Sequence, residues 1–285
     1  MDKITLYDMT DRPIKNIVWM GGGFTGVAYY AGIIRQLLIE ERTGNTRIDF
    51  ANLQHFGSSA GNGCMLAYEL LRSDTPERQK VLLDLYIYIL ANRTGNYFDM
   101  TEFMYNLMEN GIFRQHLEKD VVGIANKSIH IGMARKNSVS GMMECHYEHE
   151  FASRADIFNA TLCGGNIPLV CSHEAKCQGE DCLDGGLLGI TPETIAHYNL
   201  SPENTIVITP PIKFPYSIGT YPRWIFNIIH EYGAMDAQNR VLSQPTDAKE
   251  FREKTWKRNT IIPIVWMVRN FRQDSKWTDE LAKWK

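Results

Sequence analysis

The chain has 285 residues, enough for one large domain or two ordinary ones, and its hydrophobic and charged fractions of 44% and 22% are typical of soluble globular proteins. A formal net charge of −3 offers no general attraction for a polyanion, so nucleic acid is not an expected partner. The first twenty residues include acids and no long apolar stretch, and nowhere do ~18 consecutive apolar residues occur. We therefore expect a cytoplasmic protein whose contact with a membrane, if it has one, is peripheral.

The first predicted unit is a strand, a glycine turn and a helix. Residues 16–20, "NIVWM", form a short apolar run that is closed by three glycines, as in a buried strand that enters a tight turn. Apolar residues then recur at the three-to-four-residue spacing of a helix, at Val27, Ala31, Ile34, Leu37 and Leu38.

The remaining elements repeat this alternation. A strand is predicted at 50–56 with a helix after it, and 80–113 is mainly helical. Further strands are predicted at 128–134, 143–151, 205–209 and 260–268, and Pro263 makes the last an edge or bulged strand. With no repeat or linker in the chain, the pattern predicts one domain over 1–285: a three-layer α/β/α sandwich with a mostly parallel sheet.

The glycine turn admits two interpretations. Gly21, Gly23 and Gly26 spell G-x-G-x-x-G, which also occurs in dinucleotide-binding units. Those units require an acidic residue after the next strand, whereas Asp49 precedes it. The alternative is that Gly22 and Gly23 present bare backbone N–H groups to a substrate oxygen.

A second glycine motif follows the second strand. Gly57 to Gly61, "GSSAG", matches the G-x-S-x-G elbow, in which a sharp turn between strand and helix exposes the middle serine. Ser59 is that serine, and Ser58 is the variable position. The same residues could also form an ordinary turn with a serine cap.

A nucleophilic serine needs a base and donors for the oxyanion. Asp184 stands before Gly185 and Gly186 in a tight turn that would expose its carboxylate. By itself this triplet could equally be a hairpin turn without chemistry.

Together the motifs resemble the patatin-like phospholipases. The order is a glycine loop, then G-x-S-x-G, then D-G-G, and the resemblance covers about residues 16–209. "ADIFNATLCGGNIPLV" is similar to the family's small-residue helix before the D-G-G loop, and "ITPETIAHYNLSPENTIVIT" to the segment that follows it. Thr25 departs from the family, which usually carries Arg or Lys before the last glycine of the loop.

The resemblance implies a lipid acyl hydrolase with a serine–aspartate dyad. Ser59 would attack a fatty-acyl ester to form an acyl-enzyme, with Asp184 as the base. Backbone amides of Gly21, Gly22 and Gly23 would form the oxyanion hole, so the scheme needs no histidine, cofactor, calcium or other metal. Headgroup preference is left open, particularly because of Thr25.

Two alternatives come from different classes of protein. An α/β-hydrolase triad would add His197 or His230, but only 36 positions separate Gly23 from Ser59, too few for the several βα units that precede the elbow in that fold. A lipid-binding or scaffolding protein could keep the fold without turnover. The intact serine, aspartate and glycines favour the enzyme.

Six cysteines are expected to be reduced thiols: Cys64, Cys145, Cys163, Cys171, Cys177 and Cys182. Four of them are close to His173 in the sequence, but no C-x2-C pair occurs, so a zinc site is not predicted.

Residues 209–226 combine four prolines with aromatic side chains, including Tyr221 and Trp224. Such a segment could contact a membrane transiently at the headgroup boundary, or pack as ordinary core. The basic run at 251–260 fits a solvated helix face better than a binding patch. The oligomeric state is not indicated.

Overall fold

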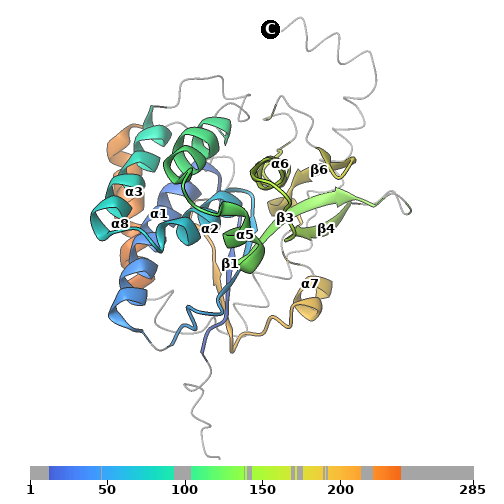
Figure 1. The fold of residues 1–285 in the computed structure, drawn as a ribbon, viewed down its shortest axis with the longest axis horizontal. Helices are drawn as coiled ribbons and strands as arrows, with labels where there is room; N and C mark the ends of the chain where they lie inside the picture. The colour runs from blue at the N-terminus through green and yellow to red at the C-terminus, as the bar shows by residue number, and fades with distance from the viewer. Residues whose placement is uncertain are drawn as a thin grey trace, which may run out of the picture.

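A seven-stranded sheet forms the centre of the computed structural model (Figure 1). Along hydrogen-bonded neighbours the strands run β5-β6-β3-β2-β1-β7. β2 and β6 pair with successive parts of one edge of β3, and β4 pairs with its opposite edge. Strands β7, β1, β2 and β3 are parallel, whereas β4 and β6 run antiparallel to β3. This confirms the predicted α/β class with a mostly parallel sheet. The bounds are β1 Asn16–Trp19, β2 Gln54–Ser58, β3 Ile129–Lys136, β4 Met143–Glu148, β5 Lys176–Cys177, β6 Glu180–Asp184 and β7 Thr205–Ile208.

The structure describes residues 13–45, 47–92, 104–137, 139, 143–167, 171, 176–188, 190, 192–212 and 221–238. The predicted strand at 260–268, the basic run at 251–260 and His173 lie outside these ranges, as do residues 213–220.

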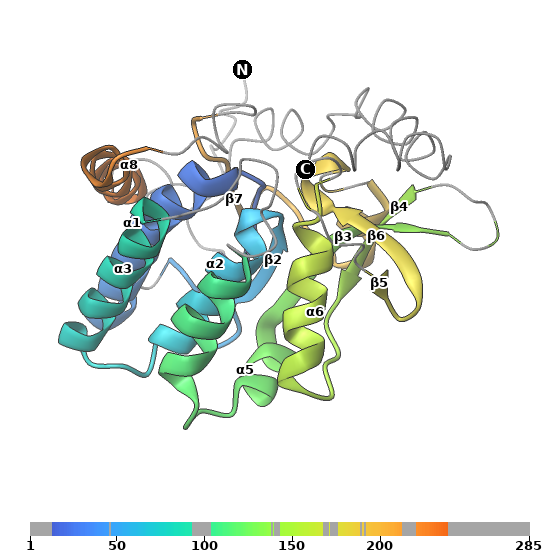
Figure 2. The same ribbon diagram turned by 90° about the horizontal axis from the view of Figure 1, so that it is seen from above.

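Most helices cover one face of the sheet, and α8 lies at the outer end of that layer (Figure 2). The helices are α1 Gly23–Thr43, α2 Ala60–Leu71, α3 Pro76–Ala91, α5 Val121–Ser128, α6 Arg154–Gly164, α7 Pro192–His197 and α8 Arg223–Asp236. Shorter helical segments are η1 Asn106–Phe113, η2 Arg114–His116 and η3 Gly185–Leu187.

Side chains of the parallel strands alternate between two cores. Ile17 and Trp19 of β1 join the large core beneath the helices. Val18 points to the opposite face, where a smaller core includes Phe56 and Leu200, which follows α7. The sheet is therefore buried on both sides at its centre, as parallel strands require.

The start of β2 differs most from the prediction. β2 begins at Gln54 rather than at residue 50, because Asp49 and Asn52 close a turn with a backbone hydrogen bond of 3.1 Å. Helix α1 continues beyond its predicted apolar positions to Thr43, and its C-cap is Gly44 in the left-handed conformation with φ of 76°.

Candidate active site

The carboxyl ends of β2 and β6 meet on one edge of β3. Ile131 and Gly132 pair with both β2 and β4, so these two strands lie on opposite edges of β3. Residues 133–135 pair with both β4 and β6, which puts β6 on the same edge as β2. β2 ends with Ser58 opposite Gly132, and β6 ends with Asp184 opposite Met133. Ser59 therefore comes directly after the residue opposite Gly132, and Asp184 lies opposite Met133, the next residue of β3. The strand pairing thus brings together two predicted site residues that are 125 positions apart in the sequence.

Ser59 has a strained backbone at the turn from β2 into α2. Its φ of 53° and ψ of −126° are rarely adopted by residues other than glycine, as a sharp elbow requires. Its N–H donates to the carbonyl oxygen of Gly164 at 3.2 Å, which ties the turn to the end of α6. A Cβ on Gly61 would lie 2.2 Å from the Trp19 carbonyl oxygen, so only glycine lets α2 approach β1 this closely.

Asp184 is buried beside Ser59. Its Oδ1 accepts the N–H of Gly186 at 2.6 Å, while Oδ2 has no hydrogen-bond partner of good geometry among the described residues. Burial raises the pKa of Asp184 to about 6, although the Ser59 hydroxyl and the Gly186 N–H both lower it. A carboxyl with this pKa can accept a proton near neutral pH.

The glycine loop, residues 21–23, lies against Ser59. A Cβ on Gly21 would lie 3.1 Å from the Ser59 Cβ and 3.6 Å from its Oγ. Gly23 has a φ of 55° and begins α1. Among the described residues, the N–H groups of Gly22 and Gly23 donate no backbone hydrogen bond, so they remain available at the positive end of the helix dipole.

Thr25 completes the first turn of α1. It is buried, and its Oγ1 donates to the carbonyl oxygen of Gly22 at 3.5 Å. The position where patatin-like enzymes usually carry a basic residue therefore holds a side chain that bonds to the loop itself.

Asn62, which sequence analysis did not identify, bonds to the backbone of β3 beside the candidate site. Its Oδ1 accepts the N–H of Gly132 at 3.2 Å, and its Nδ2 donates to the Gly132 carbonyl oxygen at 3.1 Å. The side-chain amide thus pairs with β3 as a strand would, at the junction between Ser58 and Asp184. "SAGNG" gave no hint of this contact, because Gly132 is 70 residues away.

Replacing Asn62 by leucine is expected to lower kcat for any reaction in which Ser59 and Asp184 act together by about 100-fold, since a displacement of about 1 Å at a reacting group has that effect. The variant leaves the N–H and carbonyl of Gly132 without partners, which costs about 1 to 3 kcal/mol for each group. Kinetics and thermal unfolding would measure both effects.

Asn126 provides a matched control. Its amide makes the same pair of bonds to the backbone of Phe151, at 2.8 and 2.9 Å, at the far end of α5. Asn126→Leu should reduce stability without reducing kcat in the folded protein. Equal losses of kcat in the two variants would show that Asn62 acts only through stability.

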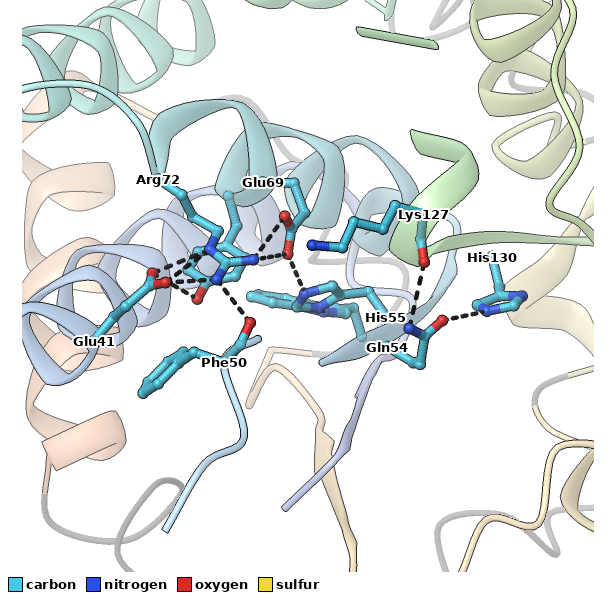
Figure 3. A network of polar contacts seen from close by, with 10 residues as sticks. Glu41, Phe50, Gln54, His55, Glu69, Arg72, Lys127 and His130 are labelled. Atoms are coloured by element: carbon cyan, nitrogen blue, oxygen red, sulfur yellow. Dashed lines mark hydrogen bonds and ion pairs between the residues drawn. The ribbon is translucent and has the colours of Figure 1, made fainter. Parts of the chain in front are cut away.

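A largely buried polar network joins the first half of β2 to the C-terminal end of α2 (Figure 3). Trp19 Nε1 donates to His55 Nδ1 at 3.0 Å, so His55 carries its proton on Nε2, which lies 2.9 Å from Glu69 Oε1. Burial raises the pKa of Glu69, but the bonds from His55 and Arg72 outweigh it and lower the pKa overall. Arg72 also bonds to Glu41 of α1 at 3.0 Å. The network therefore connects β1, β2, α2 and α1 on both sides of Ser59.

A narrow cavity of about 40 Å³ opens beside Ser59. Its walls are mainly apolar and come from the start of α1, the start of α2 and the segment that includes η1. Sequence analysis did not predict that residues 104–108 line a cavity at Ser59. The apolar spacing of this segment indicates that one face of a helix is buried, but it does not indicate which part of the protein that face packs against. The apolar side chains are Phe24, Val27, Ala60, Met104, Leu107 and Met108.

Neither histidine of the alternative triad contacts the pair among the described residues. His197 packs edge-on against Tyr198, and His230 lines a cavity between α1, α3 and α8. All six cysteines are free thiols. Within the described ranges, no group of three or more metal-binding side chains is arranged to hold an ion.

No protein-family model matches the chain, and no curated protein matches it. Among solved structures, it is similar to the crystal structure of the type III effector protein ExoU, with a TM-score of 0.30 and 13% sequence identity. The match covers 94% of this chain and 63% of that one, so the chain spans less than two thirds of the effector's length. No helix in the described part of the chain has the length and apolar character to cross a membrane.

Proposed function

We propose that the protein is a lipid acyl hydrolase that cleaves fatty-acyl esters with Ser59 and Asp184 as its catalytic pair. The observation that carries this proposal is the meeting of two strand ends at Gly132 and Met133, which brings a strained serine beside a buried carboxyl. An aspartate with an ordinary pKa is a weak base. Burial makes Asp184 a stronger one, because it raises the pKa of this carboxyl to about 6.

In the acylation step, Ser59 Oγ attacks the carbonyl carbon of the ester while its proton passes to Asp184 Oδ2. The carbonyl electrons move to the oxygen, and this oxyanion accepts hydrogen bonds from the backbone N–H groups of the glycine loop, Gly21, Gly22 and Gly23. Collapse of the intermediate breaks the bond to the alcohol, which leaves with the proton from Asp184. The acyl group remains on Ser59.

Deacylation repeats these steps with water as the nucleophile. Water attacks the acyl carbon and gives a proton to Asp184, and the second intermediate collapses to the free acid. The leaving Ser59 oxygen then regains its proton from Asp184. The walls of the cavity beside Ser59 are mainly apolar, which suits the acyl carbons next to the ester, although its volume of about 40 Å³ holds only the first of them.

The pH dependence of acylation tests the role of Asp184. The carboxylate is the active form, so labelling of the protein by a fluorophosphonate should rise with pH, with an inflection near the pKa of about 6, and then level off. Hydrolysis of a short-chain nitrophenyl ester should follow the same profile.

Mass spectrometry would locate the fluorophosphonate adduct. The proposal requires modification at Ser59. Absence of labelling in the folded protein, or an adduct elsewhere, would refute it.

A further inference from the structure

Helix α8 presents an apolar face to solvent. Trp224, Ile228, Tyr232 and Met235 recur at intervals of four, four and three residues, so they share one side of the helix, and each is 46% to 61% exposed. The opposite side packs against α1 through residues that include Phe226. Figures 1 and 2 both place α8 at the edge of the described helices. Within the row, Tyr232 also lies against Tyr29 of α1, with their ring centroids 6.2 Å apart.

This exposed row differs from the segment in which the sequence suggested membrane contact. Of residues 209–226, Phe226 is buried, Tyr221 packs against the core, and Trp224 is exposed. Residues 213–220 lie outside the described ranges. The exposed apolar surface therefore runs along α8, beginning at Trp224.

A basic groove lies next to this row. A cavity of about 550 Å³ between α1, α3 and α8 is lined by four cationic side chains and two acidic ones, in a chain whose net charge is −3. Glu231 is already paired with Arg35 at 2.8 Å. Within the described residues, Lys80 and Arg223 form no ion pair. The four cations are Arg35, Arg42, Lys80 and Arg223, and the acids are Asp84 and Glu231.

We propose that this surface, the α8 row with the adjoining groove, docks on a bilayer that contains anionic phospholipid. Trp224 and Tyr232 are amphipathic rings of the kind that settle at the boundary between headgroups and acyl chains. The Arg223 guanidinium lies over the Tyr88 ring, 5.9 Å from its centroid. Since neither Arg223 nor Lys80 pairs with a carboxylate among the described residues, both charges can meet lipid phosphates, and the groove is large enough for a headgroup.

One end of α8 lies near the start of α1 and so near the candidate active site. Tyr29 of α1 donates a hydrogen bond to Asp236 at the end of α8. Tyr29 is six residues, or about 9 Å of helix, from Gly23 in the glycine loop. The end of α8 at Asp236 is therefore the part of the docking surface nearest the glycine loop, whereas the groove lies along the second half of α1, from Arg35 to Arg42. The choice of a lipid surface as the partner rests on the proposed function. Binding to such a surface does not require ester hydrolysis, so the two can be tested separately.

Vesicle binding should be measured in a Ser59→Ala background, so that hydrolysis cannot alter the membrane. The full chain should sediment with vesicles of phosphatidylcholine and phosphatidylserine more than with phosphatidylcholine alone. Trp224→Ala with Ile228→Ala should weaken this partitioning by at least about tenfold, because two apolar anchors are lost. Unchanged partitioning would overturn the proposal.

Charge reversal tests the groove separately. Lys80→Glu with Arg223→Glu should lower binding to the anionic vesicles by about tenfold or more, and should have little effect on residual binding to phosphatidylcholine. Equal binding of the parent protein to both vesicle types, or no effect of the reversal, would contradict the proposal.

Val139→Ala is the matched control, since Val139 is an exposed apolar residue in the connection between β3 and β4. Figures 1 and 2 show these two strands on the opposite side of the molecule from α8. It should leave binding unchanged. With Ser59 restored, all docking variants should hydrolyse a water-soluble ester at the parent rate, which separates failure of docking from failure of catalysis. Sedimentation velocity without lipid should show one oligomeric state throughout; a change in the α8 variant would assign the row to self-association instead.

Discussion

Replacing Asp184 by asparagine is expected to reduce ester hydrolysis by about 10⁴-fold, the loss seen when a serine hydrolase keeps its geometry but loses a triad carboxylate. Asparagine has nearly the same shape, and its side-chain oxygen can still accept the Gly186 N–H. It cannot accept the proton of Ser59. Initial rates with a short-chain nitrophenyl ester would measure the loss.

The same substitution should stabilise the protein. Burial raises the pKa of Asp184 from 3.8 to about 6, so the native carboxyl binds its proton more tightly than the unfolded one. Native stability therefore falls as pH rises from about 4 to about 6, and the full cost of about 3 kcal/mol is present above pH 6. Asparagine has no charge to bury, and the free energy of unfolding at pH 7 should rise by up to that amount.

Denaturant unfolding at pH 4 and pH 7 would test this effect, because the gain should be present at pH 7 and largely absent at pH 4. Asp181→Asn is the control: Asp181 lies on the same strand, opposite Lys176, and its loss should affect neither activity nor this pH dependence. Full activity in a folded Asp184→Asn protein would exclude Asp184 as the base.

Ser59→Ala should lower the rate by at least about 10⁴-fold and abolish fluorophosphonate labelling, since no hydroxyl remains to be acylated. Alanine also has a Cβ, so the strained φ of 53° is kept and the free energy of unfolding should change little. Equal hydrolysis rates for the two proteins would instead favour a lipid-binding protein without turnover.

Ser58→Ala separates the two serines of the pentad. Ser58 is buried, and its Oγ has no hydrogen-bond partner within the described residues. Removing an unpaired buried hydroxyl should leave stability unchanged or slightly increased, and labelling at Ser59 should persist. Loss of labelling in Ser58→Ala, with retention in Ser59→Ala, would reverse the assignment.

The glycine and serine motifs were readable in the sequence because their conformations are local. The strand before Ser59 and the helix after it follow from apolar spacing, and glycines at 57 and 61 are what a crowded elbow needs. The boundary of β2 was wrong by four residues, since a turn at Asp49 competes with the apolar pattern of 50–56. The β5–β6 hairpin that carries Asp184 was not predicted, because its strands are short and carry little alternating pattern.

By itself, the sequence determined which segments form the parallel strands and which side chains could act as nucleophile and base, because strand pattern and turn chemistry are encoded over a few residues. Only the tertiary structure decided that β6 lies end to end with β2 along β3, with Asn62 bridging the junction. It also decided that Asp184 is buried enough for a raised pKa and that one face of α8 is left exposed. Pairing partners and burial depend on contacts between segments far apart in the chain, and no local pattern specifies them.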